Sequence, residues 1–361
     1  MSNKPAQFMD CFKITPKIGE LSDKCWGVID VGARDQCNGL EDTLLDKPAD
    51  GAVRYCYWDG AIFKDEDNGK FVMFASRWNE ADGHWGWPRS KAVYAVSDSL
   101  YGPYKDMGLV YPDVEEGYGH NVFPLKLHPG TTYNGQTVKY ALVLGDTFIS
   151  NLRGGIFVSE SLYGPWNYTG QMKITAGTGT NGSFSLSNIG IVASPDGKYL
   201  AYNRHGDIAV SDSIYGPWET RVEHLWDKMP LIAHKHDVED PIMWYSNGLY
   251  HCIANRWDER KAYYMTSEDG VSDWTMRAGT AYIPDGDMIR YDNGIVNHWN
   301  KLERPNVYIE EGNIVAMTLA VIDVAKEKEV GNDGHGSKIV VIPFDSDALA
   351  SFDADPDTVI K

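Results

Sequence analysis

The stretch Val238-Glu239-Asp240-Pro241-Ile242-Met243-Trp244 places two adjacent carboxylates directly before a proline and an apolar run. Four other parts of the chain also carry a polar pair in front of an apolar run: Trp58-Asp59, His120-Asn121, Ser187-Asn188 and Glu303-Arg304. The second residues of the five pairs fall at positions 59, 121, 188, 240 and 304, a spacing of about 60 residues. A repeat in this range with strand-like content is typical of a propeller or another repeat array.

A second repeated phrase consists of Ser, an acidic residue, Ser, an aliphatic residue and Tyr-Gly-Pro, and it follows an alternating apolar strand. Its copies begin at Ser97, Ser159 and Ser211, and a degraded copy occupies residues 266–274. Gly-Pro favours a tight turn, and the aromatic residue after it begins another strand. We therefore interpret the phrase as the turn between the third and fourth strands of a repeat.

The repeats predict an all-β fold. Each one reads as strand, hairpin turn, strand, long loop and strand, and none contains a convincing amphipathic helix. Five repeats predict a five-bladed β-propeller that forms a single domain over residues 56–361. Residues 1–55 are irregular except for an apolar patch at 26–31, so we expect an N-terminal segment that closes the ring onto the last blade.

The composition argues against several classes of partner. The 361 residues carry a net charge of −18, which disfavours binding to nucleic acid or to an anionic membrane surface. No apolar run reaches transmembrane length, and the N-terminus lacks an apolar secretory region. We therefore expect a soluble protein that is cytoplasmic, or that is periplasmic or secreted after removal of a signal peptide.

The five cysteines show no Cys-x-x-Cys spacing, which argues against a zinc site and against a disulfide framework. We expect buried free thiols. One disulfide among Cys11, Cys25 and Cys37 is the alternative, because these three lie close together in the sequence.

The register of the repeats predicts where the polar pairs lie. In a propeller the first strand of each blade lines the central axis, so the five pairs are expected to meet at one mouth of it. Crowded carboxylates push one another's pKa values apart, and one site can then hold both a general acid and a general base. The pairs bring the following residues to this mouth: Asp59, His120, Asn121, Asn188, Glu239, Asp240, Glu303 and Arg304.

Further candidates surround the pairs or follow the second strand of a repeat. Trp offers a face on which a sugar ring can stack, and Arg can clamp a carboxylate or a sulfate, although packing of the channel wall is the alternative for any one of them. His236, just before the fourth pair, is a candidate proton donor or axial cation ligand. The remaining substrate-binding candidates are Trp58, Arg77, Trp78, Arg204, His205, Arg256 and Trp257.

These motifs resemble the five-bladed propeller glycoside hydrolases of family 43 and its relatives, including family 117, over roughly residues 56–345. The phrases at 239–244 and 302–305 are closer to family 117, whose members remove α-linked anhydro-galactose from red-algal oligosaccharides. In family 43 an Asp of the first blade is the general base, a second Asp tunes and orients, and a Glu is the general acid. The resemblance implies Asp59 as the base, Glu239 or Glu303 as the proton donor, and Asp240 as the tuning residue.

Two positions depart from these families. Gly60 follows Asp59 where proline is usual, and Leu302 stands beside Glu303 where family 117 is thought to have a proton-donating His. The departures leave the identity of the acid open among Glu239, Asp240 and Glu303.

The resemblance implies an exo-acting, inverting glycoside hydrolase whose partner is an oligosaccharide from a plant or algal polysaccharide. It implies no required cofactor and no assigned metal ligand, with one divalent cation on the propeller axis as an open alternative. A homodimer is also open, although the helical N-terminal dimerisation arm of family 117 is not evident in this sequence.

Two other functions stay open. The motifs also resemble propeller polysaccharide lyases and rhamnose-releasing enzymes, in which a His or Tyr removes the proton next to a uronate and an Arg or His neutralises the carboxylate. The acidic pairs would then be structural, and the acting residues would be His120, His205, Arg204 and Arg256. Such enzymes are usually seven-bladed. A non-catalytic glycan-binding propeller is the third alternative.

Overall fold

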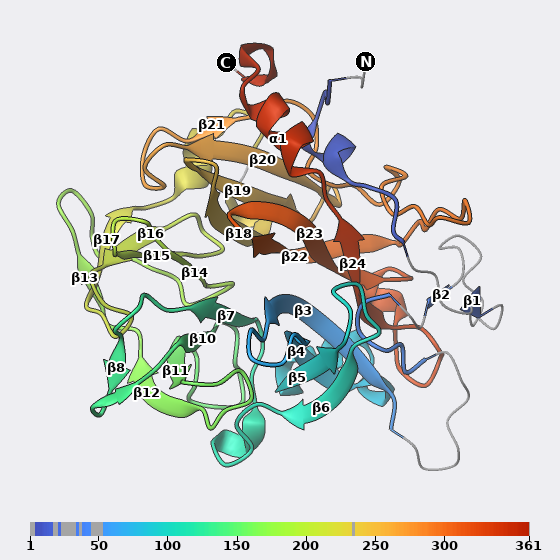
Figure 1. Ribbon diagram of the computed structural model, residues 1–361, viewed down its shortest axis with the longest axis horizontal. Helices are drawn as coiled ribbons and strands as arrows, with labels where there is room; N and C mark the ends of the chain where they lie inside the picture. Colours follow the sequence, from blue (N-terminus) through green and yellow to red (C-terminus); the bar gives the residue numbers. More distant parts are fainter. Residues whose placement is uncertain are drawn as a thin grey trace.

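Five antiparallel sheets surround a central axis as the blades of a propeller, which confirms the predicted fold (Figure 1). The computed structural model describes residues 4–16, 21–22, 34–35, 38–44, 53–232 and 235–360. The innermost strands are buried along most of their length, because neighbouring blades cover both of their faces. These strands are β3 (Tyr55–Lys64), β7 (Val122–Lys126), β14 (Gly190–Ala193), β18 (Val238–Ser246) and β22 (Lys301–Glu310).

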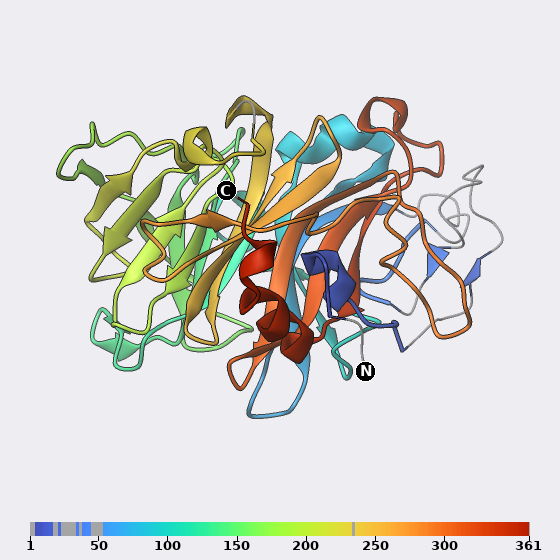
Figure 2. The same ribbon diagram turned by 90° about the horizontal axis from the view of Figure 1, so that it is seen from above.

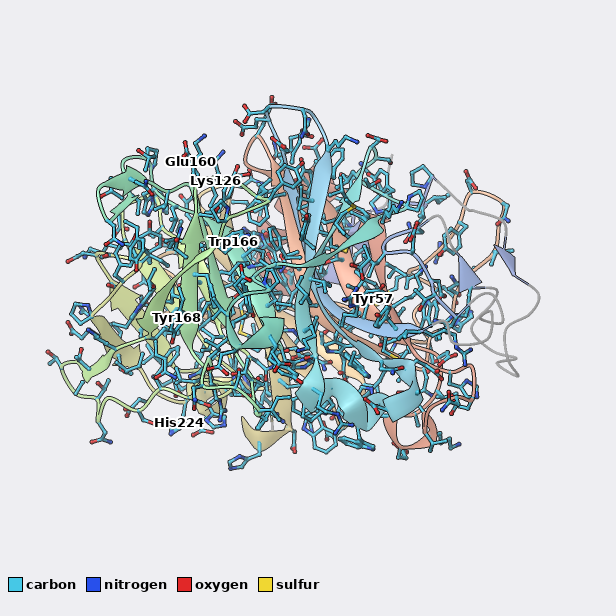
Figure 3. All side chains as sticks on the ribbon, turned by 90° about the horizontal axis from the view of Figure 1, so that it is seen from below. Tyr57, Lys126, Glu160, Trp166, Tyr168 and His224 are labelled. Atoms are coloured by element: carbon cyan, nitrogen blue, oxygen red, sulfur yellow. The ribbon has the colours of Figure 1, made fainter. Side chains whose placement is uncertain are left out.

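The other strands extend each blade outward in chain order, and the side chains between the blades fill the interior (Figure 3). Blade 1 continues with β4 (Phe71–Asn79), β5 (Lys91–Ser97) and β6 (Lys105–Leu109). Blade 2 continues with β10 (Tyr140–Leu144), β11 (Gly155–Ser159) and β12 (Asn167–Gln171), and a small hairpin of β8 (Thr132–Tyr133) and β9 (Gln136–Thr137) precedes β10.

Blades 3 to 5 differ in their outer edges. Blade 3 continues with β15 (Tyr199–Tyr202), β16 (Ile208–Ser211) and β17 (Trp218–Val222), and β13 (Ile174–Ala176) pairs with β17 in parallel. Blade 4 continues with β19 (Leu249–Arg256), β20 (Lys261–Ser267) and the short β21 (Thr275–Met276). Blade 5 has three strands in the described part of the chain, ending with β23 (Asn313–Ile322) and β24 (Ser337–Pro343).

The Tyr-Gly-Pro phrases form the turns between the third and fourth strands of blades 1, 2 and 3, as predicted. Gly102, Gly164 and Gly216 have φ values of 100°, 86° and 80°, in the left-handed region that favours glycine. The degraded copy joins β20 to β21 in blade 4, so the phrase has the same structural role in four blades.

The N-terminal residues contact the last blade at separate points. Phe12 pairs with Phe344 in an isolated bridge, and the Leu40 N–H donates to the Ile339 carbonyl at 3.1 Å. The Asn38 side chain exchanges two hydrogen bonds with the backbone of Val341, at 2.9 and 3.0 Å. A two-stranded pair, β1 (Leu21–Ser22) with β2 (Arg34–Asp35), lies between these contacts in the sequence. The patch at 26–31, predicted to supply a closing strand, lies outside the described residues.

One short α-helix corrects the expectation that the chain contains none. Helix α1 (Ser346–Asp353) follows β24 and packs against η1 (Phe8–Cys11) at the side of the propeller (Figure 2). The Asp345 side chain caps it by accepting from the Ala348 N–H at 3.0 Å. Its eight residues bury only Leu349 and Phe352, which is too short a pattern for helical periodicity to be recognised. Among the described residues no helix has the length and apolarity that crossing a membrane requires.

Cys11, Cys56 and Cys252 are buried free thiols, as predicted. Cys25 and Cys37, the other partners of the alternative disulfide, lie outside the described residues.

Candidate active site

The second residue of every polar pair has a left-handed backbone conformation. The φ values are 74° at Asp59, 52° at Asn121, 48° at Asn188, 51° at Asp240 and 48° at Arg304. Side chains other than glycine rarely adopt this conformation, and it persists where the surrounding structure imposes it. The strand register shifts at three of these sites, in β3, β18 and β22. A bulge redirects the side chains next to it, so the repeat of about 60 residues in the sequence corresponds to a repeated backbone kink at the axis.

The backbone kinks place the two members of each pair at different positions relative to the cavity. The first members all line a cavity of about 700 Å³ at one mouth of the axis: Trp58, His120, Ser187, Glu239 and Glu303. Of the second members, Asn121, Asn188 and Asp240 also reach its wall, whereas Asp59 and Arg304 do not. A cavity of this size is in the range of small-molecule sites.

The second members bind one another in a ring around the axis, which we call the axial ring (residues 59, 121, 188, 240 and 304). The Arg304 guanidinium donates from Nε to Asp59 Oδ1 at 2.7 Å and from Nη1 to Asp240 Oδ1 at 3.4 Å. Asn188 Nδ2 donates to the same Asp240 oxygen at 2.7 Å. The remaining oxygen of Asp59 accepts from Ser76 Oγ and, at 3.1 Å, from the backbone N–H that follows Asn121.

Asp146, which follows β10, completes the ring. Its Oδ2 accepts from Asn121 Nδ2 at 2.5 Å and from the Asn188 backbone N–H at 2.9 Å. Its Oδ1 lies 3.5 Å from Arg153, and Asp146 lines the cavity.

The axial ring lies across the axis at the floor of the cavity. A second cavity of about 850 Å³ lies at the opposite mouth and is lined by residues that follow the ring in each inner strand, such as Ile62, Phe123, Ile191, Ile242 and Asn306. The inner strands run from one mouth to the other, so the ring residues lie between the two cavities.

Three carboxyl groups gather at the floor. Glu239, Asp240 and Glu303 each place one oxygen within 4.8 Å of the others. Glu303 is 1% exposed and forms ion pairs with Lys326 at 2.5 Å and Lys301 at 2.6 Å. Glu239 faces the cavity and lies 3.4 Å from the Arg204 guanidinium.

Their environments push the pKa values of these groups apart. Burial, together with the charges of Glu303 and Asp240, raises the pKa of Glu239 to about 8. Burial alone would raise the pKa of Glu303 as well, but the ammonium groups of Lys326 and Lys301 outweigh it and lower that pKa to about 2. Burial raises the pKa of Asp240 to about 6 against the opposing effect of Arg304. At neutral pH the floor therefore holds a protonated Glu239 beside an ionised Glu303.

His120 is a neutral member of the wall. Burial lowers its pKa to about 4, although the charges of Asp59 and Asp146 oppose the shift. Its Nδ1 lies 2.9 Å from Ser90 Oγ, and its ring packs against Trp87 with 4.8 Å between the ring centres. The imidazole is therefore uncharged at neutral pH.

Aromatic rings surround the opening of the cavity. Trp85, Phe148 and Trp257 are 64%, 54% and 41% exposed, which is unusual for such large apolar side chains. Flat, exposed rings beside a polar floor suit a ligand with apolar faces and polar edges, as sugars have. The aromatic residues that line the cavity are Trp58, Trp78, Trp85, Trp87, Phe148 and Trp257.

Several predicted residues lie away from the cavity wall. Arg77 pairs with Asp106 at 2.5 Å and covers the Tyr55 ring, because alternation along β4 turns it away from Trp78. Arg256 pairs with the acidic side chains at 258 and 259. His205 and His236 do not line the cavity, and the latter contributes its carbonyl, which accepts from Trp257 Nε1 at 3.3 Å.

The structure adds residues that the sequence pattern missed. Lys301 and Lys326 set the charge of Glu303, and Trp87 packs on His120. Asp146 was expected at this mouth because it follows the second strand of its blade, but its place in the ring was not predicted. Lys301 could have been found, because it lies two residues before Glu303 on one strand and therefore on the same face. Lys326 belongs to a long loop whose path no local pattern defines.

The acidic trio does not fit a resident cation. Its three oxygens are close enough to ligate one, but four cationic side chains already form ion pairs with the trio: Lys301, Lys326, Arg204 and Arg304. The charge is therefore balanced by protein groups, and we derive no step through a cation on the axis.

Solved structures share this architecture. The chain is similar to Zg3597, a family 117 glycoside hydrolase from the marine bacterium Zobellia galactanivorans, with a TM-score of 0.52 and 15% identity over 95% of this chain and 92% of that chain. It is also similar to RS223 β-xylosidase, with a TM-score of 0.51 and 17% identity over 86% of this chain and 98% of that chain. At these identities the likeness establishes the propeller fold. The sequence matches no family model and no curated protein.

Proposed function

We propose that the protein is a glycoside hydrolase, exo-acting and inverting, with an oligosaccharide as its substrate. The observation that carries this proposal is a pair of carboxyl groups in opposite surroundings on the cavity floor: Glu239 faces the cavity, and Glu303 is held between Lys301 and Lys326. These surroundings raise the pKa of Glu239 and lower the pKa of Glu303. Such a split allows one site to donate a proton and stabilise positive charge at the same pH. The aromatic rim supports a sugar as the ligand.

Glu239 is the proton donor in this proposal. Its proton passes to the glycosidic oxygen as the bond between that oxygen and the anomeric carbon breaks. Glu303 stays ionised beside it and has two effects: it keeps the proton on Glu239, and it offers negative charge to the oxocarbenium-like transition state.

The general base must be a carboxyl group elsewhere on the cavity wall, outside the trio of Glu239, Asp240 and Glu303. Inversion requires two working carboxyl groups about 6.5–9.5 Å apart. Glu239, Asp240 and Glu303 approach one another within 4.8 Å. Asp59, the base implied by family resemblance, does not line the cavity, and both of its oxygens accept hydrogen bonds. We therefore assign the base to Asp146, whose Oδ1 has only the 3.5 Å contact with Arg153 among the described residues. Asp146 takes a proton from the water whose oxygen bonds to the anomeric carbon as the glycosidic bond breaks.

The closed floor supports action at a chain end. The axial ring separates the cavity from the opposite mouth, so a substrate enters and leaves by one opening. A terminal sugar fits such a blind cavity, whereas an internal sugar needs a path for the chain on both sides.

The test is a screen of plant and algal oligosaccharides with products identified by mass spectrometry. Hydrolysis adds one water for each bond cleaved, and Glu239→Gln should suppress it. Elimination would instead yield an unsaturated uronate with ultraviolet absorbance. That outcome would overturn the proposal in favour of a lyase in which the neutral His120 removes the proton. Binding without any turnover across the screen would leave a glycan-binding propeller.

A further inference from the structure

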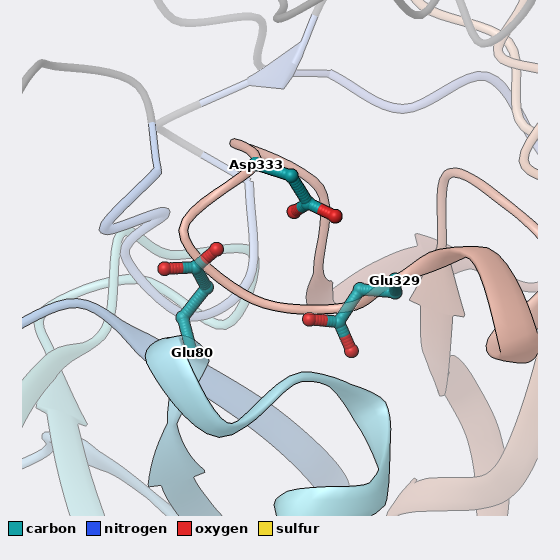
Figure 4. Close-up of side chains that lie close together, drawn as sticks. All are labelled: Glu80, Glu329 and Asp333. Carbon is teal, nitrogen blue, oxygen red and sulfur yellow. The ribbon is translucent and has the colours of Figure 1, made fainter.

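A second group of carboxylates lies beside the cavity and outside the proposed reaction. Glu80 belongs to η2 (Glu80–Asp82), directly after β4, whereas Glu329 and Asp333 belong to the loop that follows η7 (Lys326–Lys328). Figure 4 shows the three side chains converging from these two segments. One oxygen from each lies within 4.8 Å of the others.

Two of the three are buried and have carboxylate oxygens without a hydrogen-bond partner among the described residues. Glu329 is 1% exposed, and neither of its carboxylate oxygens has a hydrogen-bond partner in the described part of the chain. Glu80 is also 1% exposed, and its Oε1 is likewise unpartnered among those residues, while its Oε2 lies 3.3 Å from Arg54. Burying a carboxylate without compensation is costly, so such oxygens indicate a missing positive partner.

The charges of this cluster indicate how much positive charge its missing partner must carry. Three carboxylates carry three negative charges when ionised, and Arg54 is the cationic side chain that forms an ion pair with them in the described part of the chain, which leaves two negative charges without a partner there. Burial and then the charge of Asp333 raise the pKa of Glu329 to about 8, and burial raises that of Glu80. A proton on Glu329 would cover half of the deficit, whereas a divalent cation covers all of it.

We propose that Glu80, Glu329 and Asp333 bind one calcium ion. The spacing of 4.8 Å is about twice the 2.3–2.6 Å distance at which Ca²⁺ binds oxygen, so an ion between the three reaches all of them. All three ligands are carboxylates, which excludes the softer metals that seek sulfur or imidazole. Ca²⁺ accepts bidentate carboxylates and irregular geometry, whereas Mg²⁺ requires a near-ideal octahedron.

The ion would join two segments that form the cavity wall. Glu80 lies just before η3 (His84–Arg89), which carries Trp85 and Trp87, and the His84 N–H donates to the Glu329 carbonyl at 3.1 Å. On the other side, Lys326 lies three residues before Glu329 and reaches Glu303. Calcium binding therefore stabilises the loop that places Lys326, and the consequence for catalysis rests on the proposed function.

Calcium binding is tested without substrate. The protein is dialysed against EDTA and titrated with CaCl₂ in a calorimeter, and we expect one site per chain with a Kd at or below about 10⁻⁵ M. Glu329→Gln and Asp333→Asn should each raise that Kd at least about 100-fold, the scale expected when one charged ligand of a rigid site is lost. The matched control is Glu160→Gln, an exposed glutamate at the outside of blade 2 that should leave the Kd unchanged (Figure 3).

A second control locates the ion. Glu239→Gln removes one carboxylate of the floor, so it should retain calcium binding if the ion lies at Glu80, Glu329 and Asp333. Loss of binding in Glu239→Gln with retention in Glu329→Gln would place the ion on the axis and overturn the proposal, as would the absence of a calorimetric site in the wild type. Should Glu329→Gln fail to fold, Asp333→Asn on the half-buried loop carries the test. Hydrogen exchange provides an independent readout, because calcium should slow exchange over 80–87 and 325–335 in the wild type and not in Asp333→Asn.

Discussion

At the scale of single residues, the pair Glu239 and Glu303 shows how neighbours set chemistry. Burial and the neighbouring carboxylates raise the pKa of Glu239, whereas two ammonium groups lower the pKa of Glu303. Lys301 and Lys326 favour the charge on Glu303, and that charge then disfavours a charge on Glu239. The sequence alone left the acid open among Glu239, Asp240 and Glu303, because one of the two lysines that decide it, Lys326, lies 23 residues after Glu303 on a separate loop.

The proton donor can be tested by leaving-group dependence. Glu239→Gln should lower kcat on a natural oligosaccharide by about 10²–10⁴-fold, the range typical of a lost general acid. The same variant should retain most of its activity on aryl glycosides whose leaving groups need no proton. Equal losses on both substrates would contradict the assignment, and Glu160→Gln serves as the exposed control.

The pH profile follows from the raised pKa. Glu239 donates only when protonated, so kcat/KM should fall as the pH rises through about 8. The folded-state pKa exceeds the ordinary value of 4.5, so this group also contributes stability that is lost as the pH rises from that range to about 8. Rate profiles and urea titrations between these values measure the two effects. A basic limb at the same pH in Glu239→Gln would assign it to another group.

Asp59 is expected to act through the axial ring. Asp59→Asn leaves the buried Arg304 guanidinium with less compensation, so unfolding in urea should show a loss of about 3–5 kcal/mol. Asp98→Asn, whose side chain is 87% exposed and pairs with Lys70, should change stability by less than about 0.5 kcal/mol. If Asp59→Asn kept full stability and lost all turnover, Asp59 would be the base and Asp146 would not.

At the scale of elements, the kinked inner strand is the unit that the sequence repeat encodes. The apolar runs and the Tyr-Gly-Pro turns are local signals, so the strands and their order could be predicted from them. The left-handed residue in each polar pair has a weaker local signal: four of the five are Asp or Asn, which adopt this conformation more readily than other side chains, but Asp and Asn occur throughout the chain without it. Consequently the pairs were predicted to meet at one mouth, but their division into cavity wall and axial ring required the structure.

The turn η7 provides an element-scale prediction. Lys326→Met removes one of the two ammonium groups that hold the pKa of Glu303 at about 2. Because Glu303 must be ionised, the acidic limb of the kcat/KM profile should move to higher pH. Lys328→Met, an exposed lysine of the same turn, is the matched control and should leave the limb in place. An unchanged limb in Lys326→Met would mean that Lys301 alone sets the charge.

At the scale of the whole molecule, the five blades meet around an axis that carries a cavity at each mouth, and the axial ring lies between the two cavities. The number of blades could be read from the five polar pairs, because each pair marks one inner strand. The floor of the cavity could not be predicted from the pairs, because it depends on hydrogen bonds between residues as distant in sequence as 59 and 304. The N-terminal segment contacts the last blade, as expected, through Asn38 and Leu40, although no local pattern marks these two residues as the ones that pair with β24.

The blind cavity predicts the product pattern. Because the axial ring separates the two mouths, the enzyme should release sugars stepwise from one end of the first oligosaccharide that it cleaves in the screen. Labelling the reducing end and following the ladder of shortened products over time distinguishes this from internal cleavage. Nuclear magnetic resonance of the first product formed should show the anomer opposite to the substrate linkage, as expected for two working carboxyl groups about 6.5–9.5 Å apart. Retention would instead assign the nucleophile to the closely spaced trio of Glu239, Asp240 and Glu303, whose oxygens lie within 4.8 Å.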